Sequence, residues 1–292
     1  MNLEEGVELA RLTTIGTGGP ARAVARPSTM AELEWALAWA AERDLSVATV
    51  GLGSNVLAAD EGVDALVLKL IGDLAAVRVE GETMIAGGGA TNAVCLHQAR
   101  SAGLGGFEFA CAIPGTAGGG VRMNAGAYGS DWSEIMIRAC VVSGEAGAVW
   151  LTPEGLGLSY RHSKLSHGFV VAQVEYRLKA RPPEEIKTTI AKLIAQRKAT
   201  QPTNKRTFGS VFKNPDHEFG AGRMLEACGL KGHAIGGAVI SPKHANFIEN
   251  AGGATTADAL ALMAEARRRA HEQFGVVLEH EVELLGPIDV PG

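Results

Sequence analysis

The sequence predicts an α+β fold built from more than one domain. Its 292 residues are enough for two or three domains of ordinary size. Segments with helical spacing of apolar residues occur along the chain, and so do short β-branched runs, which indicates helices mixed with strands. Hydrophobic residues make up 46% of the chain, as expected for a protein with a buried core. Glycine is the unusual feature, at 38 residues.

The first domain, residues 1–70, is predicted to be a small α/β unit. Thr29 and Glu32 have the spacing of a capping box, and apolar residues at helical spacing follow as far as Asp44. Short strands are expected over residues 45–50 and 65–68, with a turn at 60–62 between them.

The second domain, residues 71–182, is expected to be mainly antiparallel. Short strands around 77–79 and 84–86 lead into a helix over about 91–102, which Gly103 ends. Three further strands follow, over residues 135–142, 148–151 and 169–178, with turn residues between them.

The third domain, residues 183–292, is predicted to begin at Pro182-Pro183, because prolines favour a break in regular structure. Its expected elements are helices over residues 184–198, 221–227 and 256–274, strands near residues 238 and 247, and a terminal strand over 276–285.

Charge and composition exclude several classes of function. The net charge is −5 with basic residues spread along the chain, which argues against a nucleic-acid partner. The cluster Arg267–Arg269 lies beside Glu265 and Glu272 on a predicted helix, so we interpret it as a solvated face.

Four cysteines without a C-x-x-C spacing indicate reduced, buried thiols. The start of the chain lacks the pattern of a secretory signal, and no apolar run is long enough to span a membrane. We therefore expect a cytoplasmic protein without membrane insertion. No histidine or cysteine spacing matches a metal site, so no metal is expected.

Two glycine-rich segments carry the strongest signals. Gly51-Leu-Gly53-Ser54-Asn55 follows a predicted strand, but Val56 and Leu57 exclude the Rossmann fingerprint. Residue types alone leave two interpretations of this loop, a pyrophosphate nest or an ordinary connection.

The second segment runs from Ile113 to Gly129. Its glycines after Pro114 are expected to leave several N–H groups free for an anion, with Thr116, Arg122 and Asn124 adding polar groups. Ligand contact is favoured over a structural role, and the absence of a Walker sequence argues against ATP. Residues 87–91, also glycine-rich and before a predicted helix, are expected to form a third wall of the same site.

Three further segments are weak when taken singly. Ser210 precedes Lys213 and Asn214, but a serine beside a glycine is more often a turn residue. Arg161 precedes a strand, as many surface arginines do. The alternating acids of residues 279–283 suit a half-exposed strand.

In this order, however, the segments resemble the UDP-N-acetylenolpyruvoylglucosamine reductase (MurB) family, in its shorter type II subclass. The resemblance covers nearly the whole chain. The motifs that carry it are Thr14 with Gly18-Gly19, Gly51-x-Gly-Ser-Asn55, Ile113-Pro-Gly-Thr116, Met123-Asn-Ala-Gly-Ala-Tyr-Gly129, Tyr160-Arg161-x-Ser163, Gly209-Ser-x-Phe-Lys-Asn-Pro215, Ala221-Gly222, Gly229-Leu-Lys-Gly232, Ile235-Gly-Gly237, His244-x-Asn-Phe247 and Leu278-x-x-Glu281-Val282.

The resemblance implies a vanillyl-alcohol-oxidase/PCMH-type FAD-binding fold of two α+β subdomains and a C-terminal α+β substrate-binding domain. It implies an FAD-dependent oxidoreductase, with FAD held non-covalently and NADPH as reductant. The expected substrate is the enolpyruvyl ether of UDP-N-acetylglucosamine, which is reduced to UDP-N-acetylmuramate for peptidoglycan. The implied cofactor-binding residues are Gly51, Gly53, Ser54, Asn55, Gly89, Ile113, Pro114, Gly115, Thr116, Gly119, Asn124, Ala125 and Gly126.

The same resemblance implies the catalytic residues. Arg161 and Glu281 would stabilise charge on the substrate carboxylate, and Ser210 would protonate the adjacent carbon. The expected substrate-binding residues are Tyr160, Gln201, Lys213, Asn214 and Lys231.

Two departures from the family pattern stand out. Residues 115–120 read Gly-Thr-Ala-Gly-Gly-Gly instead of Gly-Thr-Val-Gly-Gly-Ala, and Ser210 follows Arg161 by only 49 residues, without the tyrosine loop of the larger subclass.

Two alternative functions are a flavin oxidase or dehydrogenase of a free sugar or lactone, and a non-catalytic nucleotide-binding module. The chain is expected to be a monomer.

Overall fold

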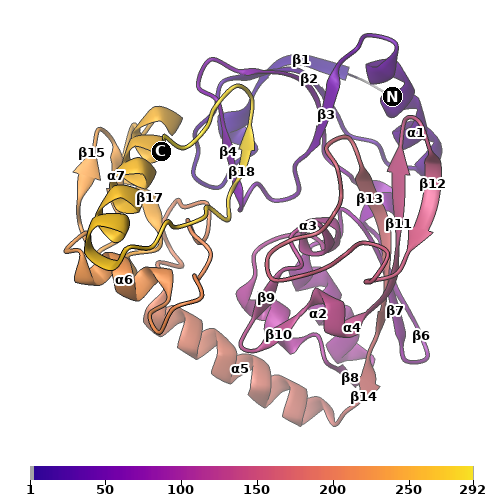
Figure 1. The fold of residues 1–292 in the computed structure, drawn as a ribbon. Helices are drawn as coiled ribbons and strands as arrows, with labels where there is room; N and C mark the ends of the chain where they lie inside the picture. Colours follow the sequence, from indigo (N-terminus) through magenta and orange to yellow (C-terminus); the bar gives the residue numbers. More distant parts are fainter. Residues whose placement is uncertain (1–2, 292) are drawn as a thin grey trace. The chain divides into compact units, whose positions relative to one another are not determined.

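The computed structural model describes residues 3–291, and its contacts divide the chain into two compact units (Figure 1). Unit 1 comprises the residues up to Glu5 together with Ala23–Leu52 and Ala65–Gln196. Unit 2 comprises Gly6–Arg22, Gly53–Asp64 and the residues from Arg197 onward. Each unit is therefore assembled from separate stretches of sequence. The expected domain boundaries, at residues 1–70, 71–182 and 183–292, remain a prediction.

Unit 1 contains a five-stranded antiparallel sheet in the order β12-β11-β13-β7-β6. Its strands are β6 (Val77–Glu80), β7 (Thr83–Gly87), β11 (Met136–Ser143), β12 (Gly147–Leu151) and β13 (Val170–Arg177). All five were expected from the sequence, with bounds that differ by a residue or two.

The alternating residues of β11 serve two hydrophobic cores, because successive side chains of a strand point to opposite faces. Ala139 and Val141 belong to a core with α2 (Asn92–Ser101) and α3 (Ala117–Arg122), whereas Cys140 and Val142 belong to a core with α1 (Met30–Ala41). The first core centres on an aromatic cluster of Phe107, Phe109, Trp132 and Tyr176, in which Trp132 Nε1 donates to the Tyr176 hydroxyl at 2.9 Å. Strand β11 is thus buried on both faces, whereas the edge strand β12 is largely exposed.

The remaining elements of unit 1 are short apart from one helix. They are β8 (Leu104–Gly105), β9 (Gly126–Ala127), β10 (Ser130–Asp131), α4 (Trp132–Ile135), β14 (Lys179–Ala180), α5 (Pro183–Thr200) and the 3-10 helices at Gly72–Ala75 and Glu108–Ala112. Helix α5 begins at the expected proline pair and crosses into unit 2 at Arg197.

A four-stranded sheet has the order β1-β2-β5-β3. Its strands are β1 (Leu3–Glu8), β2 (Pro20–Ala25), β3 (Ser46–Thr49) and β5 (Val63–Leu68), and β3 runs parallel to β5. Helix α1 starts at Thr29, whose hydroxyl accepts from the Glu32 amide, as predicted. The Glu32 carboxylate, however, accepts from the amide and hydroxyl of Ser28 rather than from Thr29.

Unit 2 is built around α7 (Thr256–Phe274) and α6 (Ala221–Ala227), whose bounds match the predicted helices. A capping box of Thr255 and Asp258 starts α7, and Gly275 ends it in the left-handed conformation. A three-stranded sheet, β15-β16-β17, and the parallel pair β4 with β18 complete the unit. These strands are β4 (Val56–Ala58), β15 (Ala234–Ile235), β16 (Ala238–Ile240), β17 (Ile248–Asn250) and β18 (Glu283–Leu285).

The expected terminal strand over 276–285 is shorter in the structure. Regular pairing is confined to β18, and an isolated bridge joins His280 to Phe212. The strands β1, β2 and β4 were not predicted: half of β1 is acidic and it also contains Gly6, half of β2 is alanine, and β4 has only three residues.

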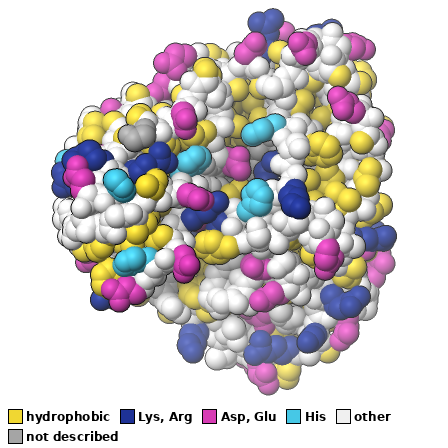
Figure 2. All heavy atoms as spheres, in the orientation of Figure 1, with side chains coloured by type: hydrophobic (Ala, Val, Ile, Leu, Met, Phe, Trp, Pro, Cys, Tyr) yellow, Lys and Arg dark blue, Asp and Glu magenta, His cyan; other side chains and the backbone are white. Residues whose placement is uncertain are grey.

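The surface agrees with the charge analysis. Figure 2 shows acidic and basic side chains interspersed over the face in view. Arg268 pairs with Glu265 and Glu272 at 2.8 and 2.6 Å, as a solvated helix face predicts. Of the four free cysteines, Cys95 and Cys140 are buried, whereas Cys111 and Cys228 are half-buried. Among the described residues, no helix has both the length and the apolar character needed to cross a membrane.

Candidate functional site

Three glycine-rich segments meet within unit 1. The Asn92 amide donates to the Gly115 carbonyl at 3.0 Å, and the Ala117 amide donates to the Ala90 carbonyl at 2.8 Å. Gly51 lies against Thr116 so closely that a Cβ on Gly51 would come within 2.6 Å of the threonine hydroxyl. Residues 87–91 therefore lie beside the segment that starts at Ile113, and their part in a common ligand site stays a prediction.

Close backbone packing explains many of these glycines. A Cβ on Gly88 would overlap the Val171 carbonyl, one on Gly89 the Leu70 carbonyl, and one on Gly120 the Trp132 ring. Gly115 and Gly119 differ, because the nearest atoms would lie at 3.4 and 3.5 Å, at ordinary contact distance. Packing within the chain thus accounts for the first three glycines, whereas Gly115 and Gly119 leave room for a ligand.

The amides at the start of α3 are already paired. The Gly118 amide donates to the Gly88 carbonyl at 2.8 Å, and the Gly119 amide to the Thr116 hydroxyl at 3.3 Å, next to the Ala117 bond given above. The expectation that this turn leaves several N–H groups free for an anion is wrong for these three residues. Tertiary bonds, which the local sequence does not reveal, satisfy them.

Lys69 adds a cation beside the first glycine loop. Its Nζ donates to the Gly51 carbonyl at 2.9 Å. Burial, with repulsion from Arg26, lowers the pKa of Lys69. The sequence contains no motif that marks this lysine, and it was not predicted as a site residue.

Asn124 organises the neighbouring loop. The side chain is buried, its amide donates to Asp131 and to the Ser159 carbonyl at 3.2 and 3.0 Å, and its Oδ1 accepts from the Ser133 amide at 3.0 Å. The residue has a φ of 38°, which few non-glycine residues adopt. Both polar atoms of the side chain have partners in the chain, so the Asn124 side chain positions the loop. A contact of Asn124 with the cofactor, as predicted, would then involve its backbone.

Arg161 is presented by a tight turn. Ser159 and His162 exchange both backbone hydrogen bonds, so that Tyr160 and Arg161 occupy the tip. Arg161 has a φ of 51°, and its guanidinium donates to the Gly126 carbonyl at 2.6 Å and lies 5.0 Å from the Tyr160 ring centre. Strained backbone of this kind is frequent where a side chain is held for a function.

Arg122, expected to add polar groups to a ligand site, bonds to the backbone of a neighbouring segment. Its guanidinium donates to the carbonyls of Leu165, Ser166 and Phe169, and its own carbonyl accepts from the Ser163 hydroxyl at 2.6 Å. It thereby orders the segment that follows Arg161.

In unit 2, tertiary pairing brings Ser210 and Glu281 onto neighbouring backbone segments. The Glu281 amide donates to the Val211 carbonyl at 2.8 Å, and the Lys213 amide donates to the Glu279 carbonyl at 2.9 Å. Both residues are half-buried. The half-buried position of Ser210 leaves part of its side chain exposed.

Asn246 fixes this pairing from the other side and was missed as a site residue. Its Oδ1 accepts from the Phe212 amide at 2.9 Å, and its Nδ2 donates to the Phe212 carbonyl at 2.8 Å. The buried Asn246 side chain thus satisfies the backbone amide and carbonyl of Phe212, as a neighbouring strand would. The motif His244-x-Asn246-Phe247 was an available signal, but sequence alone assigned the asparagine no partner.

The loop at residues 53–55 lies beside the same pair. Asn55 Nδ2 donates to the Glu281 carbonyl at 3.1 Å, and a Cβ on Gly209 would come within 3.1 Å of the Ser54 carbonyl. Thr14 links this loop to the segment before Ser210, since its hydroxyl contacts the carbonyls of Gly53 and Thr207 at 3.1 and 2.5 Å. Predicted cofactor and catalytic residues are therefore neighbours in unit 2.

The expected substrate-binding residues of unit 2 have partners within the chain. Lys213 pairs with Glu279 at 3.4 Å and Lys231 with Glu226 at 2.7 Å. Asn214 Oδ1 accepts from the Ala221 amide at the start of α6, and Gln201 accepts from Arg197 at 3.3 Å. The lysine pairs are partly exposed and can exchange for a ligand at small cost.

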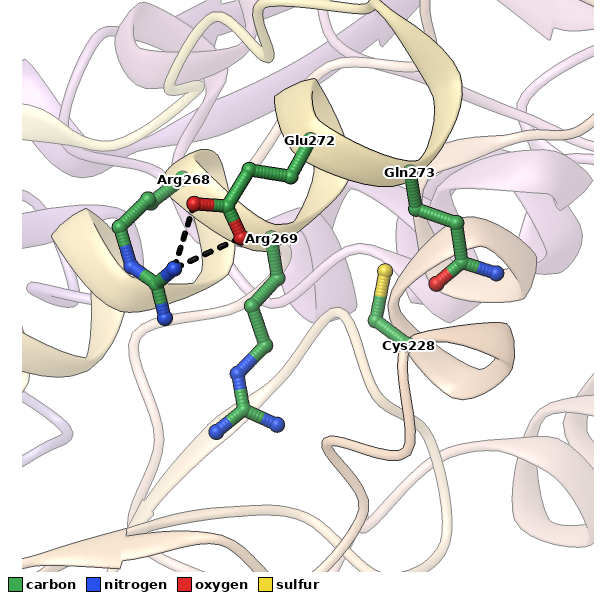
Figure 3. A pocket seen from close by; sticks show the side chains of 5 residues that line it. All are labelled: Cys228, Arg268, Arg269, Glu272 and Gln273. Carbon is green, nitrogen blue, oxygen red and sulfur yellow. Dashed lines mark hydrogen bonds and ion pairs between the residues drawn. The ribbon is translucent and has the colours of Figure 1, made fainter.

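A surface depression on α6 and α7 does not involve these residues. Figure 3 shows its lining, Cys228, Arg268, Arg269, Glu272 and Gln273. The arginines there are neutralised by glutamates of the same helix.

Known proteins match both parts of the chain. Residues 21–151 match an FAD binding domain, and residues 201–285 match the C-terminal domain of UDP-N-acetylenolpyruvoylglucosamine reductase. UDP-N-acetylenolpyruvoylglucosamine reductase 2 of Symbiobacterium thermophilum is 42% identical over 279 residues, which cover 95% of this chain and 90% of the relative. The reductase of Rubrobacter xylanophilus is 42% identical over 280 residues, with 95% and 93% covered.

A solved structure agrees. The UDP-N-acetylenolpyruvylglucosamine reductase (MurB) of Thermus caldophilus matches with a TM-score of 0.85 at 36% identity, over 98% of this chain and 99% of the other.

The residues around Gly51 and Gly115 fit a flavin nucleotide. Gly115 and Gly119 leave open Cα surface, Lys69 supplies a cation, and a buried acceptor oxygen, Asn92 Oδ1, has no partner among the described residues. Together with the matched FAD binding domain, these features define an FAD-dependent oxidoreductase.

The chain belongs to the UDP-N-acetylenolpyruvoylglucosamine reductase (MurB) family. The expected α+β fold with an FAD-binding domain, the FAD cofactor and the place in peptidoglycan precursor synthesis are confirmed by this membership.

Proposed function

We propose that this chain uses NADPH to reduce the enolpyruvyl group of UDP-N-acetyl-3-O-(1-carboxyvinyl)-glucosamine, which yields UDP-N-acetylmuramate. The single observation that best supports the proposal is the pairing of residues 211–213 with 279–281, because it joins the segment that carries Ser210 to the segment that carries Glu281. Bound FAD supplies the hydride that NADPH provides.

The substrate needs a cation as it reacts. When a hydride reaches the methylene carbon, negative charge moves into the carboxylate, and a fixed positive group lowers the energy of that state. Arg161 has this role in the proposal. Its bond to the Gly126 carbonyl holds the guanidinium before substrate arrives, so little reorganisation is required.

Ser210 is proposed as the acid that gives a proton to the neighbouring carbon. A serine hydroxyl is a weak acid. The alkoxide that would remain after the transfer must therefore regain a proton from a nearby group or from solvent. The half-buried position of the side chain permits such exchange. Glu281 is proposed to orient the carboxylate region of the substrate together with Arg161.

The proposed FAD contacts are the cofactor-binding residues predicted above, with the open surface at Gly115 and Gly119 as their strongest support. Tyr160, Gln201, Lys213, Asn214 and Lys231 are the proposed substrate contacts. We also propose a cytoplasmic monomer that has no nucleic-acid partner and does not insert into membranes.

The test is to purify the chain and record its visible spectrum, then to follow NADPH oxidation with and without the enolpyruvyl substrate. We expect released flavin to be FAD, and NADPH oxidation to depend on the substrate. Turnover with a free sugar and oxygen would favour the oxidase alternative, and absence of any flavin would contradict the proposal.

A further inference from the structure

Asn92 is the first residue of α2 and lies almost wholly buried, with 2% of its surface exposed. Two bonds tie it to the predicted FAD loop. Its backbone amide donates to the Gly115 carbonyl at 3.0 Å, and its Nδ2 donates to the Ile113 carbonyl at 2.9 Å. The residue therefore holds both ends of the segment Ile113–Gly115.

The second side-chain atom has no such partner. Asn92 Oδ1 is buried and accepts no hydrogen bond from the residues that the structure describes, and no other buried side-chain nitrogen or oxygen among them is in this state. Buried acceptors without a donor are rare in native proteins, because each loses its bond to water.

The orientation of the amide group follows from its partner. Exchanging Oδ1 and Nδ2 would set an oxygen against the Ile113 carbonyl, where two acceptors repel each other. The unsatisfied atom is thus the oxygen, and it requires a donor from outside the described chain.

A buried water is the first possible donor, but a water inside a protein usually needs two to four polar partners. No second unsatisfied side-chain atom is buried among the described residues to share it. A flavin nucleotide offers N–H and O–H donors, and the Asn92 side chain contacts the loop proposed to bind it.

We propose that Asn92 is a flavin-nucleotide-binding residue whose Oδ1 accepts a hydrogen bond from a donor group of the bound nucleotide, while its Nδ2 holds the Ile113–Gly115 loop. This inference rests on the proposed function, because it requires the chain to bind FAD. Neither the composition nor any motif had marked this residue.

The experiment measures the FAD dissociation constant of the apoprotein, by flavin fluorescence, for the wild type and for Asn92→Leu. Gln98→Leu is the matched control, since it makes a similar change at an exposed position of the same helix. We expect Asn92→Leu to raise the dissociation constant about tenfold, as for one lost hydrogen bond, and Gln98→Leu to leave it unchanged.

A second measurement follows the oxygen itself and uses the wild-type chain. With ¹³C-labelled asparagine, the Asn92 Cγ resonance should move downfield when FAD is added, because the carbonyl accepts a new bond. Titration with riboflavin and with ADP assigns the donor to one half of the nucleotide. The Asn92→Leu spectrum identifies the resonance by its absence.

The outcomes separate the two proposals. If FAD binds but the Asn92 Cγ resonance does not move, as a permanently bound water would give, this inference is wrong while the proposed function stands. The same holds if Asn92→Leu binds FAD with the wild-type dissociation constant. Failure of the wild-type chain to bind FAD overturns the proposed function and this inference together.

Discussion

The Asn55 side-chain amide donates to the Glu281 main-chain carbonyl at 3.1 Å, although the residues are 226 positions apart in sequence. The Glu283 amide returns a bond to the Asn55 carbonyl at 3.0 Å, which starts the parallel pairing of β4 with β18. The loop at residues 53–55, which the glycine motif predicts to bind the cofactor, thus also fixes the backbone position of the proposed catalytic glutamate. The Asn55 side chain therefore joins the predicted cofactor loop to the backbone of the glutamate that we propose as catalytic.

Substitution of Asn55 should therefore affect the second half-reaction. We expect Asn55→Ala to slow reoxidation of the reduced flavin by substrate roughly threefold to tenfold, as for one lost hydrogen bond. Stopped-flow absorbance of each half-reaction measures this. Asn204→Ala, at an exposed turn, is the control. An unchanged reoxidation rate would show that the bond does not hold Glu281.

Ser210→Ala tests the proposed acid. Reduction of the flavin by NADPH should stay within about twofold of the wild-type rate, because no proton from Ser210 is needed. Reoxidation by substrate should fall by roughly 10² to 10⁴. Ser166→Ala removes an exposed hydroxyl for comparison. Equal slowing of both half-reactions would remove Ser210 from this role.

Gly119 and Gly120 form a matched pair with opposite expectations. Gly120→Ala should lower the free energy of unfolding by about 1–3 kcal/mol, because its Cβ would overlap Trp132. Gly119→Ala has room and should preserve stability, yet it covers the surface proposed for FAD and should weaken FAD binding. Urea unfolding of the apoprotein and FAD titration measure the two effects. Wild-type FAD affinity in Gly119→Ala would remove Gly119 from the cofactor site.

Asn246→Ala should destabilise the chain strongly. It removes two bonds and leaves the amide and carbonyl of buried Phe212 unpaired, so we expect a loss of about 2–4 kcal/mol. Urea unfolding with Asn204→Ala as control tests this. A loss below about 1 kcal/mol would mean that water takes over both bonds.

His244 should make the stability depend on acid. Burial, helped by the positive charge of Lys231, lowers the pKa of His244 below its ordinary value of 6.5. As the pH falls through 6.5, the unfolded chain binds a proton that the folded chain does not, and the free energy of unfolding decreases. It continues to decrease until the pH reaches the folded-state pKa.

The measurement is urea unfolding between pH 5 and 8. His244→Gln keeps an acceptor for the Asn246 amide and should reduce the acid-dependent slope by at most about 1.4 kcal/mol per pH unit. His97→Gln, on the exposed face of α2, is the comparison. If both variants keep the wild-type slope, His244 does not contribute.

Local patterns predicted the regular elements well. Helices α6 and α7 have the predicted bounds because apolar spacing and the glycines that follow them, Gly229 and Gly275, act within a few residues, and a capping box also starts α7. Strands β1, β2 and β4 were missed, since their sequences lack the alternation of β-branched and polar residues that marks a strand, and β4 finds its partner, β18, only at the far end of the chain.

The site was predicted by ordered motifs rather than by residue chemistry. Gly51, Gly115 and Arg161 could be selected through family resemblance. Asn246, Lys69 and Asn92 could not, because their significance lies in bonds to the backbone of distant segments.

The glycine excess illustrates the division. Composition and motifs were enough to predict that residues 87–129 need bare backbone and that the chain resembles a flavin-dependent reductase. Which glycines serve packing, as at Gly88 and Gly120, and which leave room for a ligand, as at Gly115 and Gly119, became clear from the packed fold. The physical reason is that a missing Cβ is recorded in the sequence, whereas the atoms that would have met it come from elsewhere in the fold.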